Sequence, residues 1–545
     1  GAVQAVAEGA LTTISTTGTF NVFLPNLLND FITLTISSND VLVADANNLV
    51  VVNSTINGDL NIHAIRDVTL LGTITAGDVK VNAGLDIYGA GNTFGSTLDN
   101  NINIDGGRYV DFANFGSPSR FNGAVYFNGT IVVVAATGDL VLSGGNASIQ
   151  LLLQTDGSIR QDVNAAYLNV SGNAVLIAKN DIVLNTPGNV ITGSISSSAT
   201  NITLLNTETL ILGATTATGD LTLIAPAGVD QMASAFISLV NPLGVHGVIA
   251  PVDDDRIASV TVSGKTDIQA AGNMVNLPYL TNSLPVLAVV ADSAMIGTAG
   301  AVNLLPSTVS RYILKAVGAI TQTGVLTSDL LDMAAAGKFG FAPITLDSAN
   351  KLREVSVQGS TVVINNSRYL AMGLSFADSL KLNAQGDLFQ VDPMRVNNSL
   401  TITAQDVSLQ NADNSLFGTL TLNAASAKVF NTANFNLGAV TVTGLLALES
   451  SGAINQTGVL NAGQSTFTAT GDITLNNAAN AFGKLSAKAA NIGVTSIGAL
   501  TLDGVYGCSA GSGRGRPYHH FHYWHLQCIP SQPAQRLYHP DHQQQ

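Results

Sequence analysis

The chain has 545 residues, of which 46% are hydrophobic and 11% are charged, and its formal net charge at pH 7 is −14. This acidic balance argues against a nucleic-acid partner, because the sequence offers no cluster of cations to neutralise phosphate groups. No uninterrupted apolar stretch reaches the ~18 residues that a membrane-spanning helix needs, so membrane insertion is not expected.

Short alternating segments that begin with Gly-Asp recur along the chain. They start at Gly58-Asp59, Gly77-Asp78, Gly138-Asp139, Gly219-Asp220 and Gly471-Asp472. After each turn, apolar residues occupy every second position, which is the period of a strand with one buried face. Few windows show the spacing of an amphipathic helix, and β-branched residues and Gly are abundant. We therefore expect an all-β chain of short strands that follow Gly-Asp corners.

Residues 88–127 are rich in aromatic side chains. They include Tyr88, Phe94, Tyr109, Phe112, Phe115, Phe121, Tyr126 and Phe127. Aromatic rings can stack on sugars or form a partner-binding patch. The candidates for this contact are Tyr109, Phe112, Phe115 and Tyr126. Two other interpretations of the segment are a stacked aromatic ladder in the core and an inserted lobe packed on the solenoid.

Asp105 and Asp111 lie on either side of Arg108 in the sequence. Some β-helix enzymes cleave polysaccharides with grouped carboxylates, and general acid–base cleavage needs two carboxyl groups ~5–9 Å apart. These residues could be arranged in that way. Most aspartates of the chain, however, follow turn glycines, where a role in the turn accounts for them. We therefore expect no catalytic residue and no cofactor-binding residue.

Asp253, Asp254 and Asp255 form the densest charge cluster of the chain. Their carboxylates could bind Ca²⁺, which prefers oxygen ligands. The cluster lacks the Asp and Gly periodicity of calcium-binding nonapeptide repeats, and a solvated loop explains it equally simply. Calcium at these three residues is the one metal candidate.

Longer units also repeat. Gly318 to Leu326 returns as Gly452 to Leu460, and Asp406 to Asn414 returns as Asp472 to Asn480. The second pair is about 66 residues apart, which is room for about three coils of ~20–25 residues. Such repeats favour a solenoid of roughly 22 coils over a sandwich or a propeller. Asn477 and Asn480 are expected to adopt the left-handed conformation at turns and to hydrogen-bond along the stack.

Ser451 to Val505 contains the segments SGAINQTGVLNAG, ATGDITLNNAANAFGKLSAKAANI and SIGALTLDGV. These segments resemble the repeats of filamentous-haemagglutinin-like large exoproteins. Gly318 to Leu326, Ser399 to Gly418 and Ile191 to Leu223 are similar to them more loosely, so that the resemblance covers about a third of the chain. It implies a right-handed parallel β-helix, secretion to the bacterial cell surface or the medium, and a role in adhesion or biofilm formation.

The composition changes abruptly at Gly507, after which both Cys, the only Trp and six of the eight His occur. Codons compatible with Gly507 to Gln545, when read one base later, encode Gly1 to Asn39 without a mismatch. The gene therefore repeats with a period of about 506 codons. We interpret residues 1–506 as one long β-solenoid unit and residues 507–545 as an out-of-frame copy of residues 1–39. This tail is expected to be disordered or loosely packed, and its His and Cys residues fit no standard zinc pattern.

The sequence thus predicts a structural or adhesive segment of a giant tandem-repeat bacterial exoprotein, and not an enzyme. Repeated units would form a stiff rod on which many weak sites act together by avidity. The expected partners are neighbouring copies of the unit and a glycan or protein of a host surface or matrix. Two alternatives are a self-assembling extracellular filament or sheath component, whose exposed edges pair, and a polysaccharide-active β-helix enzyme.

Overall fold

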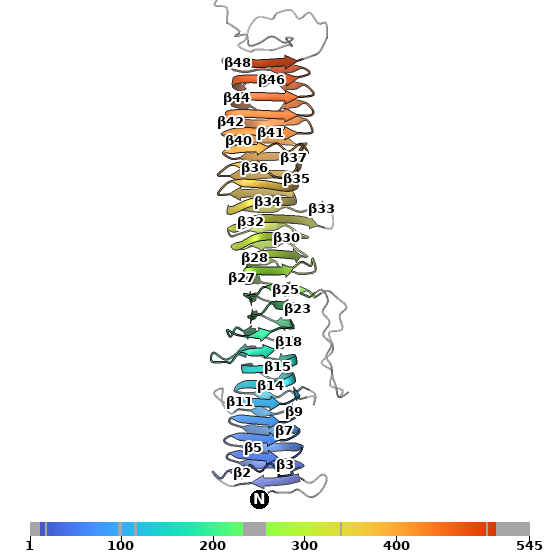
Figure 1. The fold of residues 1–545 in the computed structure, drawn as a ribbon, viewed down its shortest axis with the longest axis vertical. Coiled ribbons are helices and arrows are strands. Elements are labelled where there is room, and N and C mark those ends of the chain that lie inside the picture. Colours follow the sequence, from blue (N-terminus) through green and yellow to red (C-terminus); the bar gives the residue numbers. More distant parts are fainter. Residues whose placement is uncertain are drawn as a thin grey trace, which may run out of the picture. The chain divides into compact units, whose positions relative to one another are not determined.

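The computed structural model describes residues 11–16, 19–95, 101–113, 117–232, 258–337, 340–497 and 500–507. All regular elements in these ranges are β-strands. The chain divides into two compact units, residues 1–298 and 299–545, and in each unit the strands stack in chain order (Figure 1). The predicted all-β parallel β-helix is therefore confirmed, with about 24 turns in place of the roughly 22 expected.

Unit 1 contains strands β1 to β28. The first fourteen are β1 (Leu11–Ser15), β2 (Val22–Leu24), β3 (Thr33–Ser38), β4 (Val41–Asp45), β5 (Leu49–Ile56), β6 (Leu60–Ala64), β7 (Val68–Ala76), β8 (Val79–Ala83), β9 (Asp86–Ala90), β10 (Thr93–Phe94), β11 (Asn101–Gly106), β12 (Tyr109–Phe112), β13 (Arg120–Phe121) and β14 (Ala124–Ala136). The others are β15 (Leu140–Thr155), β16 (Ile159–Gln161), β17 (Leu168–Val170), β18 (Asn173–Ala178), β19 (Ile182–Leu184), β20 (Val190–Ile191), β21 (Ser194–Ala199), β22 (Ile202–Leu205), β23 (Leu210–Ala217), β24 (Leu221–Ile224), β25 (Val229–Gln231), β26 (Val260–Val262), β27 (Lys265–Leu277) and β28 (Val286–Thr298).

Unit 2 contains strands β29 to β48. The first ten are β29 (Val302–Leu304), β30 (Ser307–Ala316), β31 (Ile320–Gln322), β32 (Leu326–Gly337), β33 (Gly340–Phe341), β34 (Ile344–Asn366), β35 (Leu370–Ala384), β36 (Leu388–Gln390), β37 (Met394–Thr403) and β38 (Asp406–Leu409). The others are β39 (Ser415–Leu416), β40 (Thr419–Ala424), β41 (Ser426–Asn431), β42 (Phe435–Ser450), β43 (Ile454–Gln456), β44 (Leu460–Ala469), β45 (Ile473–Leu475), β46 (Ala481–Ala489), β47 (Ile492–Val494) and β48 (Thr501–Gly507).

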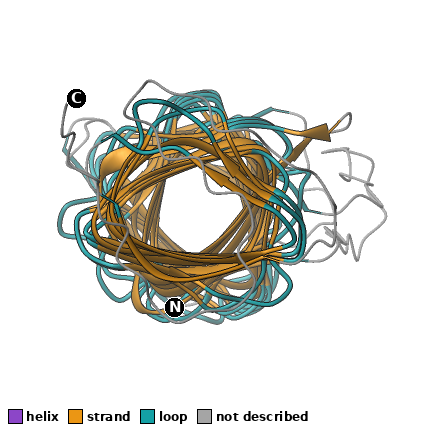
Figure 2. Cartoon of the chain, turned by 90° about the horizontal axis from the view of Figure 1, so that it is seen from above, coloured by secondary structure: helices purple, strands orange, loops and turns teal. Residues whose placement is uncertain are grey.

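One coil consists of three strand segments, as β42 shows. Its residues 435–437 pair in parallel with β43, residues 440–442 with the start of β44, and residues 445–450 with the rest of β44. Each segment thus lies on the equivalent segment about 19 residues later. Seen from above, the strands form the wall of the coil and the loops lie outside it (Figure 2). Inward side chains such as Leu446 and Ile454 are 0% exposed and fill the interior.

The Gly-Asp corners lie where the sequence placed them, directly before strands. Strand β6 begins at Leu60, after Gly58-Asp59, and its burial alternates as expected. The backbone N–H of Leu60 donates to the carbonyl of Asp78 in the next coil at 2.9 Å. The side chain of Asp40 also accepts a hydrogen bond from the backbone N–H of Asp59 at 3.1 Å. Corner aspartates therefore join successive coils.

Close stacking of the corners explains their glycines. A Cβ atom added to Gly58 would collide with the carboxylate of Asp40, and one added to Gly318 would lie 2.5 Å from the backbone nitrogen of Ala301. Gly300 is different, because a Cβ atom there would meet nothing within 4 Å. The need for glycine therefore comes from the backbone of the preceding coil.

Buried amide side chains form a recurring group that we call the amide clamp. In the clamp of Gln456 and Asn480, each side chain donates to the other, with Asn480 Nδ2 to Gln456 Oε1 at 3.0 Å. The backbone N–H of Leu460 also donates to Asn480 Oδ1 at 2.9 Å. The other clamps are Gln161–Asn189, Gln231–Asn282, Gln322–Asn350 and Gln390–Asn414. All five asparagines are 0% exposed, so each clamp satisfies polar groups that water does not reach.

The structure corrects one expectation about Asn477 and Asn480. The hydrogen bond along the stack is confirmed for Asn480, which bonds to Gln456 in the preceding coil. The left-handed conformation is wrong, because Asn53 is the one non-Gly residue with positive φ among the described residues. Asn480 points into the core, where its amide is held by paired groups and the backbone remains in the ordinary region.

The clamps also show that the long repeat and the coil have different periods. Gln390 pairs with Met372, whereas Asn366, from the preceding clamp column, pairs with Ala384. Gln456 pairs with Leu437, which belongs to a third column. A repeat of about 66 residues therefore equals three coils of about 19 residues plus one further segment. Successive clamps of unit 2 lie at three different corners of the coil.

We predict that Gly318→Ala destabilises unit 2 by about 1–3 kcal/mol, because the added methyl group would overlap the backbone of Ala301. Gly300→Ala is the matched control at the adjacent coil, and it should be neutral or slightly stabilising. Thermal unfolding of the two variants checks this. Equal stability of both variants would contradict a steric origin of the corner glycines.

Asp45 takes the position that asparagine has in later coils. Its Oδ2 accepts from the backbone N–H of Phe31 at 2.6 Å, as Asn366 Oδ1 accepts from Leu352 at 2.8 Å. Asp45 is 0% exposed, and burial raises its pKa, although its backbone hydrogen bonds act in the opposite direction. Since the folded chain then holds the proton more tightly than the unfolded chain, the contribution of Asp45 to stability falls as pH rises from about 4 through the folded pKa.

We expect Asp45→Asn to stabilise unit 1 by on the order of 1 kcal/mol at pH 7, because it removes a buried charge. The gain should vanish near pH 3, where Asp45 is protonated in both states. Unfolding curves at the two pH values measure the difference, with the exposed corner residue Asp59 mutated to Asn as a control. The same gain at both pH values would rule out a titrating Asp45 as its cause.

Candidate functional site

The aromatic segment 88–127 is folded into the coils. Its described residues lie in the range of β9 to β14. The rings of Phe94, Phe112, Phe121 and Phe127 form a buried cluster, in which Phe112 and Phe121 have ring centres 5.6 Å apart. Phe112 is 0% exposed. This predicted partner-binding residue therefore belongs to the core.

Tyr109 and Tyr126 are the two candidates that present part of their rings to solvent. The guanidinium group of Arg108 lies 4.9 Å from the centre of the Tyr109 ring. The hydroxyl of Tyr126 accepts a hydrogen bond from Asn146 Nδ2 at 2.6 Å. Phe115, the fourth candidate, lies outside the described residues. Both tyrosines thus already have partners within the coil.

Arg108 forms a bidentate ion pair with Asp86, which the sequence analysis did not single out. Arg108 Nε donates to Asp86 Oδ1 at 2.9 Å and Nη2 to Oδ2 at 2.5 Å, and the Tyr88 hydroxyl donates to Oδ2 at 3.0 Å. The Asp86 side chain is 3% exposed. Its hydrogen bond raises the pKa of Arg108, and burial together with the charge of Asp86 raises the pKa of Tyr88. Both groups stay protonated and hold two coils together.

Asp105 and Asp111 are not arranged around Arg108, and that expectation is wrong. Asp105 accepts hydrogen bonds from Asn82 Nδ2 at 3.1 Å and from Asn128 Nδ2 at 2.6 Å, in the coils on either side. Asp111 accepts from the backbone two residues later at 2.9 Å. The two carboxylates therefore serve separate contacts, and the arginine between them in sequence is held by Asp86 in another coil.

The calcium candidates Asp253, Asp254 and Asp255 lie outside the described residues. In the part of the chain that the structure describes, no three or more His, Cys, Asp or Glu side chains gather closely enough to hold a metal ion. Within the same ranges, no helix has the length and apolar character to cross a membrane.

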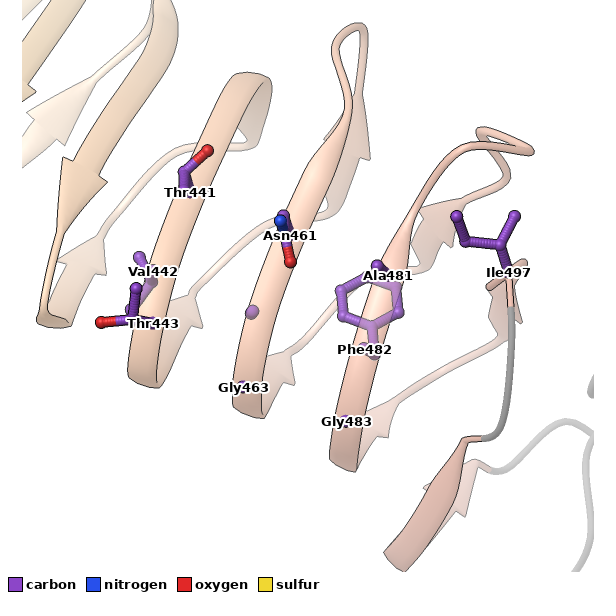
Figure 3. Close-up of a pocket in the computed structure, with 10 residues that line it drawn as sticks. Thr441, Val442, Thr443, Asn461, Gly463, Ala481, Phe482, Gly483 and Ile497 are labelled. Carbon is purple, nitrogen blue, oxygen red and sulfur yellow. The ribbon is translucent and has the colours of Figure 1, made fainter.

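An open groove of about 380 Å³ crosses three coils of unit 2 (Figure 3). Its lining residues are Thr441, Val442, Thr443, Asn461, Ala462, Gly463, Ala481, Phe482, Gly483 and Ile497. A Cβ atom on Gly463 or Gly483 would collide with a carbonyl of the preceding coil, so glycine keeps the coils close here. The groove offers hydroxyl and amide groups and no ionisable side chain. It can hydrogen-bond a neutral polar ligand.

A second groove, of about 450 Å³, is lined by residues 158–163 and 181–187 of unit 1. Arg160 Nη2 donates to Asp139 Oδ2 at 2.5 Å, and Asp181 Oδ1 accepts from Asn201 Nδ2 at 2.9 Å. These charged groups therefore connect coils. Val163, 95% exposed, belongs to the loop that follows the clamp residue Gln161.

Four of the seven exposed aromatic side chains in the described residues lie between 341 and 417, in unit 2. With two half-buried or charged neighbours they form what we call the aromatic–arginine patch. Its members are Phe341, Tyr369, Phe376, Phe389, Arg395 and Phe417. The ring centres of Phe341 and Phe376 are 5.0 Å apart, and those of Tyr369 and Phe389 are 5.9 Å apart.

Arg395 occupies the middle of this patch. Its guanidinium group lies 5.4 Å from the centre of the Phe376 ring and 5.7 Å from that of Phe417. Leu374 and Val391, 56% and 50% exposed, extend the apolar surface at the adjoining corner. In the described residues, no carboxylate forms an ion pair with Arg395. Exposed apolar surface around an available cation is typical of a contact site for a partner.

The sequence analysis missed this patch because its members are about one coil apart. Phe376 pairs with Arg395, and Ala371 pairs with Phe389, so the contacts join residues 18–19 positions apart. No short window is therefore rich in aromatic residues. A usable signal does exist, because Phe376 and Phe389 occupy outward positions of alternating strands, where most coils have Thr, Asn or Ser.

Comparison with known proteins gives one family. Residues 128–198, 291–358, 359–423 and 424–489 match a family model described as repeats of unknown function (DUF5649). Each matched segment contains one amide clamp, which ties the family repeat to the length of three coils plus one segment. No match is found among curated proteins or among solved structures. The chain is a repeat protein with a β-solenoid fold, and four of its segments are similar to this repeat family.

Proposed function

We propose that this chain is a structural and adhesive segment of a giant tandem-repeat exoprotein of the bacterial cell surface. The observation that supports the proposal most is the parallel register in each unit, in which every coil is covered by the next. A fold of this kind lengthens by repetition, because a repeat needs contacts only with its neighbours. The out-of-frame copy of residues 1–39 supports further copies of the unit in the gene.

Attachment is assigned in this proposal to exposed side chains of the coils. The aromatic–arginine patch is the best candidate, because aromatic residues and Arg dominate the binding energy of many interfaces. A single patch of this size would bind weakly, and a chain of many units would present it repeatedly, so that avidity replaces single strong contacts. The partner would be a glycan or protein of a host surface or matrix. The surface location rests on the resemblance to filamentous-haemagglutinin-like exoproteins.

A self-assembling extracellular filament or sheath component is the second candidate. The same patch favours it, because a second copy of the chain could also cover the exposed rings. The two functions differ in what happens to the purified chain: the adhesive segment stays monomeric without its partner, and the filament component associates with itself.

We predict that Phe376→Ser, Arg395→Ser and Phe417→Ser together reduce binding of chain-coated beads to extracellular matrix at least ~10-fold, because they remove the centre of the patch. Thr401→Ala with Thr421→Ala is the matched control, since these outward residues lie in neighbouring coils away from the patch. Binding is measured as beads retained under flow, and light scattering reports association.

The outcomes separate the two candidates. Loss of bead binding by a variant that is monomeric, as the unmodified chain is, supports adhesion. Concentration-dependent association of the unmodified chain, abolished by the triple variant, would replace adhesion by filament assembly. Unchanged bead binding and unchanged association would show that the patch serves neither role.

A further inference from the structure

We infer that the amide clamp is a loop-closing device, which marks one corner in each repeat as a position where the solenoid can present variable segments. The clamp fixes both ends of the loop that follows the glutamine, whatever the length of that loop. The use of these corners for display rests on the proposed function, whereas tolerance of loop length is a property of the fold alone.

The same atoms close the corner in all five clamps. The asparagine Oδ1 accepts from the glutamine side chain and also from the backbone N–H of the residue that ends the loop. These backbone donors are Leu168 at 2.9 Å, Val260 at 2.9 Å, Leu326 at 2.8 Å, Met394 at 3.0 Å and Leu460 at 2.9 Å. One asparagine thus holds the start and the end of the loop through a single oxygen atom.

Loop length varies widely between these fixed ends. Three clamps enclose three residues, as at 457–459, and the clamp of Gln161 encloses six, 162–167. The clamp of Gln231 encloses residues 232–259, of which 233–257 lie outside the described residues. The hydrogen bond of the last residue is nevertheless 2.9 Å both after residues 232–259 and after residues 457–459. The geometry of the ends is therefore independent of the loop.

The physical reason is that the loop residues contribute little to the core. Val163, Val391 and Val459 are 95%, 50% and 41% exposed, so the loops face solvent. The buried amides are already paired with one another and with the coil. Lengthening a flexible loop between fixed ends adds only a slowly growing entropic cost, about (3/2)RT ln n for n residues.

The Gly-Asp corners behave differently, because their own atoms make the stacking contacts. The backbone N–H of Gly471 donates to the carbonyl of Gly452 at 2.9 Å, and the carbonyl of Asp472 accepts from Ile454 at 2.9 Å. A Cβ atom on Gly471 would lie 3.0 Å from the nitrogen of Ala453. An insertion between Gly471 and Asp472 would therefore pull apart contacts that hold the coils in register.

The clamps of unit 2 would direct such segments to three sides. Gln322, Gln390 and Gln456 lie at different corners, since each repeat is three coils plus one segment long. Loops inserted at equivalent positions of successive repeats would then surround the coil and would not crowd one face. This arrangement suits a surface that has to meet partners from any direction.

The test inserts the same 12-residue Gly/Ser segment into the full chain, either after Thr457 or after Gly471. We expect the insertion after Thr457 to lower the midpoint of thermal unfolding by no more than ~3 °C, and the insertion after Gly471 to lower it at least twice as far. Far-UV circular dichroism and limited proteolysis show whether the coils remain folded. Equal shifts at the two corners would overturn the inference.

A second variant tests the clamp itself. Gln456→Met keeps the side-chain volume but removes both amide hydrogen bonds to Asn480. In this background the insertion after Thr457 should cost more than it does in the unmodified chain, because the ends of the loop are no longer held together. An insertion shift that is the same with and without Gln456 would show that the clamp does not close the loop. None of these measurements depends on adhesion, so the proposed function can fail independently.

Discussion

Each coil has to lie directly on the coil before it, and the rest of the structure follows from this constraint. Side chains such as Leu446 are buried only because neighbouring coils cover them, so no single coil has a complete core. The turns must then be tight enough for backbone to meet backbone. This explains why glycine stands at corners such as Gly318, and why corner aspartates bond to the next coil.

Polar side chains inside the corners meet the same constraint by a second route. An unpaired amide would be costly in the interior, where water does not compensate it. Gln456 and Asn480 remove this cost by bonding to each other and to the backbone. Because only matching coils bring these groups together, the clamp favours one register over its alternatives. The step of one segment per repeat distributes the clamps, and the loops that they close, around the coil.

The candidate surface illustrates how far local sequence carries an argument about function. The high aromatic density of residues 88–127 led to Phe112, which packs in the core. The exposed rings of Tyr369 and Phe389 stack on one another across neighbouring coils, and no local window contains both. Likewise, Arg108 finds Asp86 in the preceding coil and neither of the aspartates beside it in sequence. Contacts of this kind depend on the number of residues per coil, which short motifs do not contain.

The sequence alone determined that the chain is all-β, that strands begin after Gly-Asp corners, and that a repeat of about 66 residues runs through it. These properties depend on alternation and turn chemistry within a few positions, where neighbours along the chain act directly. The tertiary structure alone decided which corner each clamp occupies, that Asn480 points inward, and which aromatic rings remain exposed. These properties arise between residues about 19 to 28 positions apart, because stacking joins one coil to the next and the length of each loop sets which side chains meet.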